Sequence, residues 1–144
     1  MDFPLDIDFI NSCLPHGPEM VLLDQVTRWQ VDEIDCLSWA HENPNHPLSR
    51  DGLLPAISIV EIAAQAMAVH SAISAGEEKL QRKGVLAGVR KLNLNKARLD
   101  DIIGPIEIKA KLVMGEDRSG IYDFEAKSGD QLIAKGRLTV VIPK

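Results

Sequence analysis

Residues Ile57–Ser74 read ISIVEIAAQAMAVHSAIS and contain neither glycine nor proline. Pro55 stands just before this stretch and Gly76 just after it, which is the usual placement of these residues at the two ends of a helix. Apolar side chains fall on nearly every side of the predicted helix. Such a helix is buried on most sides rather than laid on a surface. The stretch therefore predicts one long helix in the middle of the core.

Short or alternating apolar segments on both sides of this helix read as strands. Two are expected before it and four after it: Met20–Arg28, Glu33–His41, Val85–Leu94, Ile106–Met114, Ile121–Lys127 and Leu132–Ile142. Short turns between the later strands predict antiparallel pairing. Residues 42–56 hold three prolines and one glycine and predict a long irregular loop.

One antiparallel sheet and one apolar helix have an obvious arrangement. The sheet curls around the helix, and the helix fills its concave face, which gives an α+β fold. The edges of such a sheet stay open, so the pattern also predicts dimerisation from edge to edge.

The bulk properties predict a single soluble domain, 1–144, with a net charge of −5. An acidic chain is a poor candidate for general binding to nucleic acid. Cys13 and Cys36 form neither a CxxC motif nor a metal-ligand spacing, so they read as reduced thiols. The acidic N-terminus lacks the basic region of a signal peptide, and the apolar run Ile57–Ile73 is too short and too often interrupted to span a bilayer. We therefore expect a cytoplasmic protein without membrane insertion.

A carboxylate in the apolar helix is the main candidate for chemistry. Glu61 and Gln65 are four residues apart and lie on one face of the helix. Burying a carboxylate without a partner is costly, so the position needs a reason. Either this face reaches solvent, a partner or polar groups that satisfy the acid, or Glu61 is held in an apolar channel that suits it to proton transfer.

The four histidines differ in their surroundings. His41 and His46 lie in or beside the long loop before the helix, and a histidine base, a carboxylic acid and a helix N-terminus are the parts needed to remove a proton beside a thioester carbonyl. His16 reads as part of a Gly/Pro turn, and His70 as a residue that complements the helix dipole or is partly exposed. The spacing of the histidines predicts no metal site.

A local basic stretch interrupts the acidic sequence. Seven Lys or Arg and no Asp or Glu occur between Lys79 and Arg98. The stretch is either a solvated strand face or a surface that attracts an acidic partner.

Two motifs resemble the β-hydroxyacyl-acyl-carrier-protein dehydratases. LPHGPEMVLLDQV resembles their LPHRYPFLLVDRV opening, and LPAISIVEIAAQAMA resembles their MPGVLILEAMAQ helix start. GVLAGVRKLNLNKARL and AKGRLTVVI are similar to later strands, so the resemblance covers most of the chain. It is closest to the divergent dehydratase-like subunits of aryl-polyene biosynthesis.

The resemblance implies a hot-dog fold, a homodimer or heterodimer with a second hot-dog subunit, and no cofactor. It implies dehydration of 3-hydroxyacyl thioesters, carried on the phosphopantetheine of acyl carrier protein, to trans-2-enoyl thioesters in polyene or fatty-acid-like synthesis. Glu61 would be the catalytic acid, His46 the base and Gln65 a substrate-binding residue. The N–H of Ala56 would hold the thioester oxygen. Arg90, Lys91, Lys96 and Arg98 would form the patch for the acidic carrier protein.

The sequence departs from the family around the histidine. Asn45-His46-Pro47-Leu48 replaces the His-Phe-Pro motif, and His46 lies 15 residues before Glu61, one more than in the family. His16 is the substitute for His46 if the longer loop misdirects it. Two alternatives stay open: a non-catalytic partner subunit of a heterodimeric dehydratase, and an acyl thioesterase.

Overall fold

The computed structural model describes residues 2–14, 18–76, 85–116 and 119–141. A short helix α1 (Ile7–Cys13) leads into the strands β1 (Gln25–Gln30) and β2 (Glu33–Ser38). The long loop contains the 3-10 turn η2 (Ala40–Glu42), and a second turn η3 (Ala56–Ser58) runs directly into the long helix α2 (Ile59–Ala75). Four strands follow: β3 (Val85–Leu94), β4 (Ile106–Glu116), β5 (Ser119–Ser128) and β6 (Gln131–Val141).

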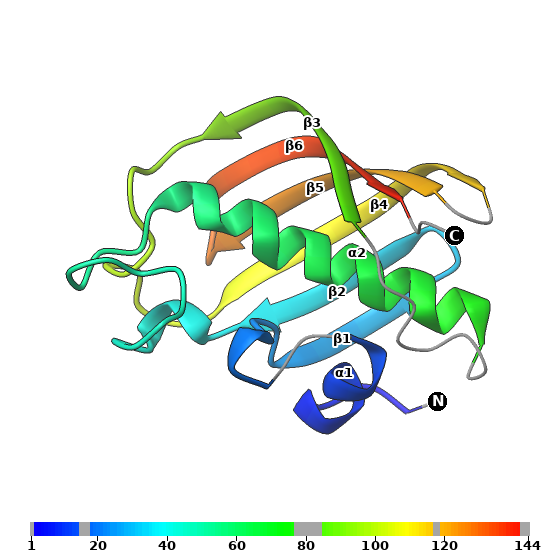
Figure 1. Ribbon diagram of the computed structural model, residues 1–144, viewed down its shortest axis with the longest axis horizontal. Coiled ribbons are helices and arrows are strands. Elements are labelled where there is room, and N and C mark those ends of the chain that lie inside the picture. The colour runs from blue at the N-terminus through cyan, green and yellow to red at the C-terminus, as the bar shows by residue number, and fades with distance from the viewer. Residues whose placement is uncertain (1, 15–17, 77–84, 117–118, 142–144) are drawn as a thin grey trace.

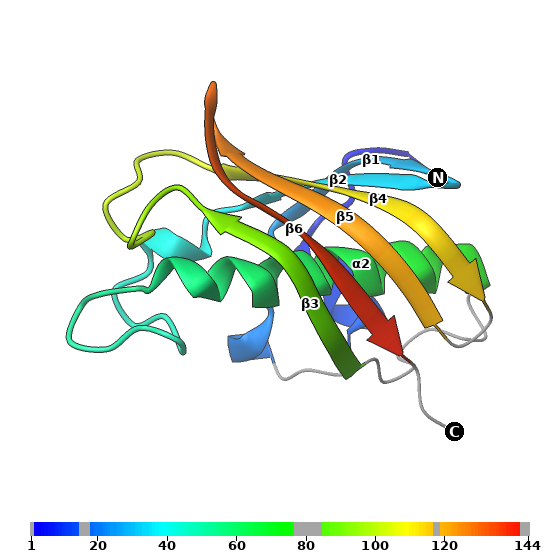
Figure 2. The same cartoon turned by 90° about the horizontal axis from the view of Figure 1, so that it is seen from above.

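The strands form one six-stranded antiparallel sheet in the order β1-β2-β4-β5-β6-β3. The sheet bends around α2, which lies in its concave face (Figures 1 and 2). The helix packs against β2, β4, β5 and β6, and α1 adds a further contact. This is the expected hot-dog arrangement of a curved sheet around one apolar helix.

The core forms where the inward side chains of the sheet meet the helix. Ile59, Ile62 and Met67 of α2 are fully buried, as are Ile106 and Phe124 of the sheet. Residues Ala56–Ala75 are long and apolar enough to cross a membrane by length and composition, but 67% of that segment is buried within the fold. Burial by its own sheet is what a core helix requires.

The first strand begins later in the structure than the sequence predicts. Residues 20–24 are apolar, but β1 starts only at Gln25. Side chains from other elements hold this segment instead, because Leu22 donates its N–H to Gln65 and its carbonyl accepts the hydroxyl of Ser38. These backbone groups are therefore withdrawn from a strand ladder.

The second predicted strand ends too late, since β2 stops at Ser38 and His41 lies in the turn η2. The Asp24 carboxylate accepts the Trp39 N–H at 2.6 Å, and the Ser38 hydroxyl accepts the Ala40 N–H at 3.4 Å. Side-chain acceptors of this kind compete with a strand ladder and favour a turn.

Side chains of β4 alternate between the core and the outer face only over the first part of the strand. Ile106, Ile108 and Ala110 face the core, whereas Met114 is largely exposed. The pairing of β4 with β5 shifts register between Leu112 and Met114. A bulge of this kind changes the face to which the following side chain points.

Candidate functional site

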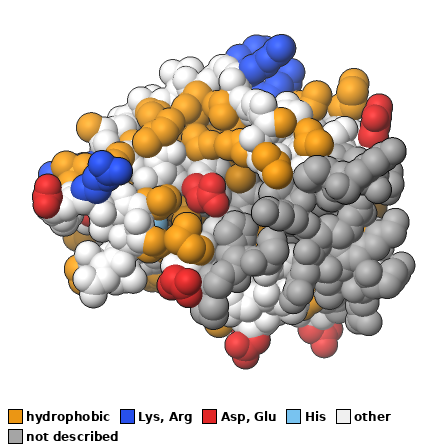
Figure 3. Space-filling view, in the orientation of Figure 1, with side chains coloured by type: hydrophobic (Ala, Val, Ile, Leu, Met, Phe, Trp, Pro, Cys, Tyr) orange, Lys and Arg blue, Asp and Glu red, His pale blue; other side chains and the backbone are white. Residues whose placement is uncertain are grey.

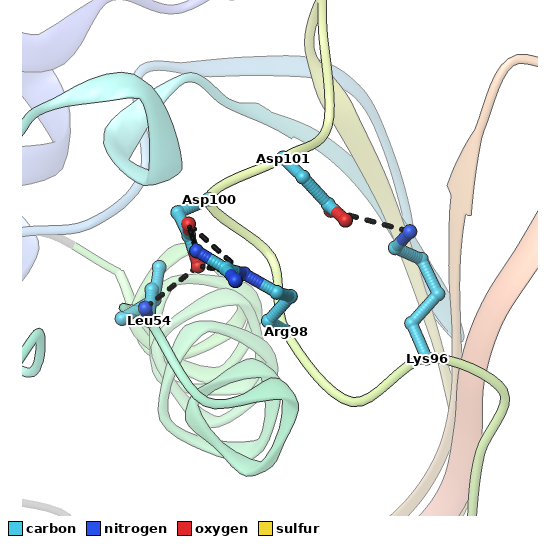
Figure 4. A network of polar contacts seen from close by, with 5 residues as sticks. All are labelled: Leu54, Lys96, Arg98, Asp100 and Asp101. Atoms are coloured by element: carbon cyan, nitrogen blue, oxygen red, sulfur yellow. Dashed lines mark hydrogen bonds and ion pairs between the residues drawn. The ribbon is translucent and has the colours of Figure 1, made fainter. Parts of the chain in front are cut away.

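The start of the long helix is tied to the loop that follows β3. The Ala56 N–H donates to the Ala97 carbonyl at 3.0 Å, and the Leu99 N–H donates to the Leu54 carbonyl at 2.8 Å. The Asp100 carboxylate accepts the Leu54 N–H at 2.8 Å, and Arg98 forms a two-pronged pair with the same carboxylate (Figure 4). These bonds fix the direction in which η3 and α2 leave the loop.

These hydrogen bonds form a clamp between the helix start and the loop after β3, and the clamp affects the role predicted for Ala56. Its N–H was expected to hold the thioester oxygen, but in this chain it donates to the Ala97 carbonyl. A backbone N–H that is engaged in a good hydrogen bond has no second hydrogen to offer. The thioester oxygen therefore needs another donor, or the clamp has to open.

Glu61 lies half-buried in the first turn of α2, on the one helix that fills the sheet. One turn later, Gln65 is only 2% exposed, and both ends of its amide are engaged. Its oxygen accepts the Leu22 N–H at 2.8 Å, and its nitrogen donates to the Met20 carbonyl at 2.7 Å. In this chain Gln65 holds the segment before β1 against the helix, so it positions backbone rather than offering a free amide to a substrate.

His46 is buried in the loop before the helix, with 3% of its surface exposed. Its Nδ1 accepts the Leu48 N–H at 3.0 Å, and its carbonyl accepts the N–H and the hydroxyl of Ser49. Burial lowers the pKa of His46, and the neighbouring His41 lowers it further. The ring is therefore neutral at pH 7.

His41 is the histidine beside this loop to which the resemblance gave no role. It lies in η2 with 2% of its surface exposed, close enough for its charge to act on His46. Both ring nitrogens of His41 and the Nε2 of His46 make no hydrogen bond in the part of the chain that the structure describes. Buried polar atoms are rarely left this way, and one that is calls for an explanation.

The structure describes only one of the two histidines predicted as the base, and it does not show that one in contact with Glu61. His16 lies outside the described residues, so its place as a substitute base is untested. Among the described residues, the partners of His46 are Asn43, Leu48 and Ser49, with His41 as its neighbour, and Glu61 is not one of them. The acid and the loop histidine thus stand on separate elements of one chain.

The interpretation of His70 as dipole-complementing or partly exposed is wrong. The ring is 1% exposed, its Nδ1 is 2.7 Å from the Tyr122 hydroxyl, and its Nε2 is 3.0 Å from the Gln30 carbonyl. A carbonyl only accepts, so Nε2 carries the proton and Nδ1 accepts from the tyrosine. Trp29 stacks on the same ring, which makes His70 a core residue with both nitrogens satisfied.

The basic stretch is partly neutralised by residues that follow it. Arg98 is paired with Asp100, and the Lys96 ammonium is 3.2 Å from the Asp101 carboxylate (Figure 4). Arg90 and Lys91 lie exposed on β3, at the edge of the sheet. Of the four residues predicted to meet the carrier protein, these two form no salt bridge with the described residues, although Lys91 is close enough to Asp123 to help lower the pKa of that carboxyl. No group of three possible metal-ligating side chains occurs in the described ranges.

Comparison with known proteins identifies the family. Residues 9–144 match the ApeP-like family of ApeP dehydratases. The chain belongs to the ApeP dehydratase family. The resemblance read from the opening and helix motifs is thereby confirmed.

Three relatives place this ApeP dehydratase family member among known proteins. It is 29% identical to the 3-hydroxyacyl-[acyl-carrier-protein] dehydratase FabZ of Rhizorhabdus wittichii, over 96% of this chain and 90% of the relative. It is 21% identical to the FabZ of Xanthomonas oryzae, over 95% and 92% of the two chains. Among solved structures, the dehydratase heterocomplex ApeI:P from Xenorhabdus doucetiae matches with a TM-score of 0.84 and 24% identity, over all of this chain and 93% of that one.

Proposed function

We propose that this chain takes part in the dehydration of 3-hydroxyacyl thioesters, carried on acyl carrier protein, to trans-2-enoyl thioesters. Its membership of the ApeP dehydratase family carries the proposal. The FabZ relatives support it, because they are 3-hydroxyacyl-[acyl-carrier-protein] dehydratases and match this chain along almost their whole length. A carboxylic acid in the first turn of the core helix and histidines in the preceding loop supply the acid and base types that the reaction needs.

The proposed reaction moves two protons. A base removes the proton from the carbon next to the thioester carbonyl, and the electron pair of that C–H bond becomes the new carbon–carbon double bond. The C–O bond at the 3-position breaks, and the hydroxyl leaves as water after taking a proton from the Glu61 carboxylic acid. The resemblance assigns the role of base to His46, which lies 15 residues before Glu61 where the family's histidine lies 14 before its carboxylate.

We propose that the partner subunit docks on β3. The opposite edge of the sheet, β1, is partly covered because Leu5 exchanges two hydrogen bonds with Val26. On β3 the large exposed apolar side chains are Val85, Leu86, Val89 and Leu94, and hydrophobic side chains gather over β3 and the adjoining face of α2 (Figure 3). An open apolar edge strand is a template for pairing with another chain.

The acyl carrier protein is the proposed substrate carrier. It would approach along Arg90 and Lys91, which stay exposed beside the docking edge. Two free buried cysteines, Cys13 and Cys36, agree with the proposal that the protein works in the reducing cytoplasm.

A second candidate function is that of a non-catalytic partner that shapes a heterodimeric dehydratase. Two observations favour it. The Ala56 N–H is already engaged by Ala97, and the solved structure with the TM-score of 0.84 is a complex named for two different dehydratase subunits.

The test is a mass-spectrometric assay for loss of water from a 3-hydroxyacyl-carrier-protein, with and without a second hot-dog dehydratase subunit. Glu61→Gln should lower the rate by about 100-fold or more, because a general acid contributes roughly 10²–10⁴-fold. Glu107→Gln, on the exposed face of β4, is the matched control and should leave the rate unchanged.

Three outcomes separate the candidates. Water loss that requires Glu61 supports the dehydratase. Water loss that needs the second subunit and survives Glu61→Gln supports the non-catalytic partner. Release of free thiol in place of water loss would identify a thioesterase.

A further inference from the structure

Successive turns bring the two loop histidines together. The Asn43 N–H donates to the Ala40 carbonyl, the His46 N–H donates to the Asn43 carbonyl, and the Ser49 N–H donates to the His46 carbonyl. This chain of turns folds residues 40–49 back on themselves, and it brings His41 close enough to His46, five positions further on, to lower the pKa of the His46 ring. Three of their four ring nitrogens lack a hydrogen-bond partner within the described residues.

The one engaged nitrogen decides which proton His46 carries. A backbone N–H can only donate, so the Nδ1 that receives the Leu48 N–H must be the unprotonated nitrogen. The neutral ring then carries its proton on Nε2, the buried nitrogen with no partner. In this form His46 offers an N–H donor, and it has no free lone pair with which to remove a proton from a substrate.

His41 supplies the complementary group. A neutral imidazole always has one N–H and one lone pair, and neither nitrogen of His41 is engaged by the described chain. A lone pair is therefore free at His41, and an N–H is free at His46. The donor expected from Ala56 is in turn occupied by the Ala97 carbonyl. Donor and base are both needed, and the histidine pair offers one of each.

We propose that His41 is the proton acceptor of the site and that the Nε2–H of His46 is the donor that holds the thioester oxygen. This division of roles rests on the proposed dehydration. The lone pair of His41 takes the proton from the carbon beside the carbonyl. The C–H electron pair becomes the carbon–carbon double bond, while the hydroxyl leaves with the proton of Glu61 as water. His41 leaves the step as an imidazolium and Glu61 leaves it as a carboxylate. His41 then gives its proton to solvent and Glu61 takes one from solvent, which restores both groups.

Both rings are covered in the free chain, so the thioester reaches them only when the loop yields or the partner subunit reshapes it. The roles survive such a movement. Leu48 lies two residues from His46, and their hydrogen bond is local to one turn. It moves with the loop and keeps the proton on Nε2.

Glutamine variants separate this assignment from the one that the resemblance implies. A glutamine side chain can present an N–H near the place of Nε2 but has no basic nitrogen. His46→Gln should keep the rate of water loss within about tenfold of the parent, whereas His46→Ala should lose about 100-fold or more, the effect of deleting one donor to a developing oxyanion. His41→Gln should lose about 10²–10⁴-fold, as expected for a missing base. Equal losses in His46→Gln and His46→Ala, or a fully active His41→Gln, would overturn the proposal.

A measurement without turnover keeps the test independent of the proposed function. Nitrogen-15 NMR of the histidine rings in the folded protein reports which nitrogen is protonated. We expect Nε2–H for His46 at pH 7, and an Nδ1–H form would overturn the proposal whether or not water loss is seen. If His41→Gln does not fold, as judged by its thermal melting, the two His46 variants and the NMR assignment still decide. If the parent loses no water with either subunit arrangement, the dehydration itself fails, and the tautomer result stands apart from it.

Discussion

Buried histidines lie at both ends of the helix region, and they differ in whether their ring nitrogens are hydrogen-bonded. Toward the C-terminal half of α2, His70 is 1% exposed and has a partner for each nitrogen, with Tyr122 on one side and Gln30 on the other. In the loop before α2, His41 and His46 are buried to the same degree, yet three of their four nitrogens make no hydrogen bond in the described chain. The same residue type at the same burial is therefore structural at one end and available at the other.

The difference shows why burial alone does not identify a working histidine. A satisfied imidazole rigidifies the core, because its hydrogen bonds are strong where water is excluded. An unsatisfied one lowers stability and is retained where it serves another purpose. The pairing of each ring nitrogen separates the two cases.

The largest expected effect is on the free energy of unfolding, when the ring of His70 and the ring of His46 are each deleted. His70→Ala removes a packed ring and leaves the Tyr122 hydroxyl and the Gln30 carbonyl without a partner, so it should cost about 3–5 kcal/mol of the free energy of unfolding. His46→Ala loses one bond to Leu48 but also removes an unsatisfied buried nitrogen, and should cost about 1 kcal/mol. Urea unfolding of both variants measures the difference. Similar costs for the two would contradict the contrast between the ends.

A smaller loss of stability is expected when only one hydrogen bond of His70 is removed. Tyr122→Phe keeps the ring but removes the hydroxyl that donates to His70 Nδ1 at 2.7 Å. A buried lone pair is then unpaired, and we expect a loss of about 1–2 kcal/mol in unfolding free energy with unchanged water loss in the enzymatic assay. Loss of activity in a folded Tyr122→Phe would extend the functional site to this end of the helix.

The smallest effect concerns pH. Burial lowers the pKa of His46 and of His70 below the ordinary value of 6.5, and for His70 hydrogen bonds to the Gln30 and Val31 carbonyls oppose this shift in part. The unfolded chain therefore binds more protons than the folded one as pH falls below that value. The stability from these rings is fully present above pH 6.5 and is lost as pH falls toward the lowered pKa values.

Thermal melting at pH 7.5 and pH 5.5 measures this effect. The parent should melt at a lower temperature at pH 5.5, and His46→Gln and His70→Gln should each show a smaller fall. A fall that is the same in all three proteins would assign the pH dependence to other groups.

Sequence patterns predicted the parts of the fold that depend on local periodicity. The limits of β3 were predicted to the residue, and the long helix was placed within two residues of α2. Misplaced limits, at residues 20–24 and after Ser38, lie where side chains from distant elements take over backbone hydrogen bonds. Local propensity contains no information about an amide arriving from Gln65, 43 residues away.

The same limit governs the site. Glu61 could be singled out because a carboxylate within an apolar helix is recognisable from the sequence alone. The amide partners of Gln65, the engagement of Ala56 by Ala97, and the neutralisation of Arg98 and Lys96 by aspartates that follow them depend on how separate segments meet.

The chain's own pattern of apolar and polar residues sufficed for the α+β class, the core helix, the acid on it and the family. Periodicity and composition act through burial, which needs no knowledge of specific partners. Which histidine nitrogens are satisfied, which N–H is already taken and which sheet edge stays open were decided by the tertiary structure. Hydrogen bonds are short and directional, so a partner is known only once the folded chain has brought it within reach.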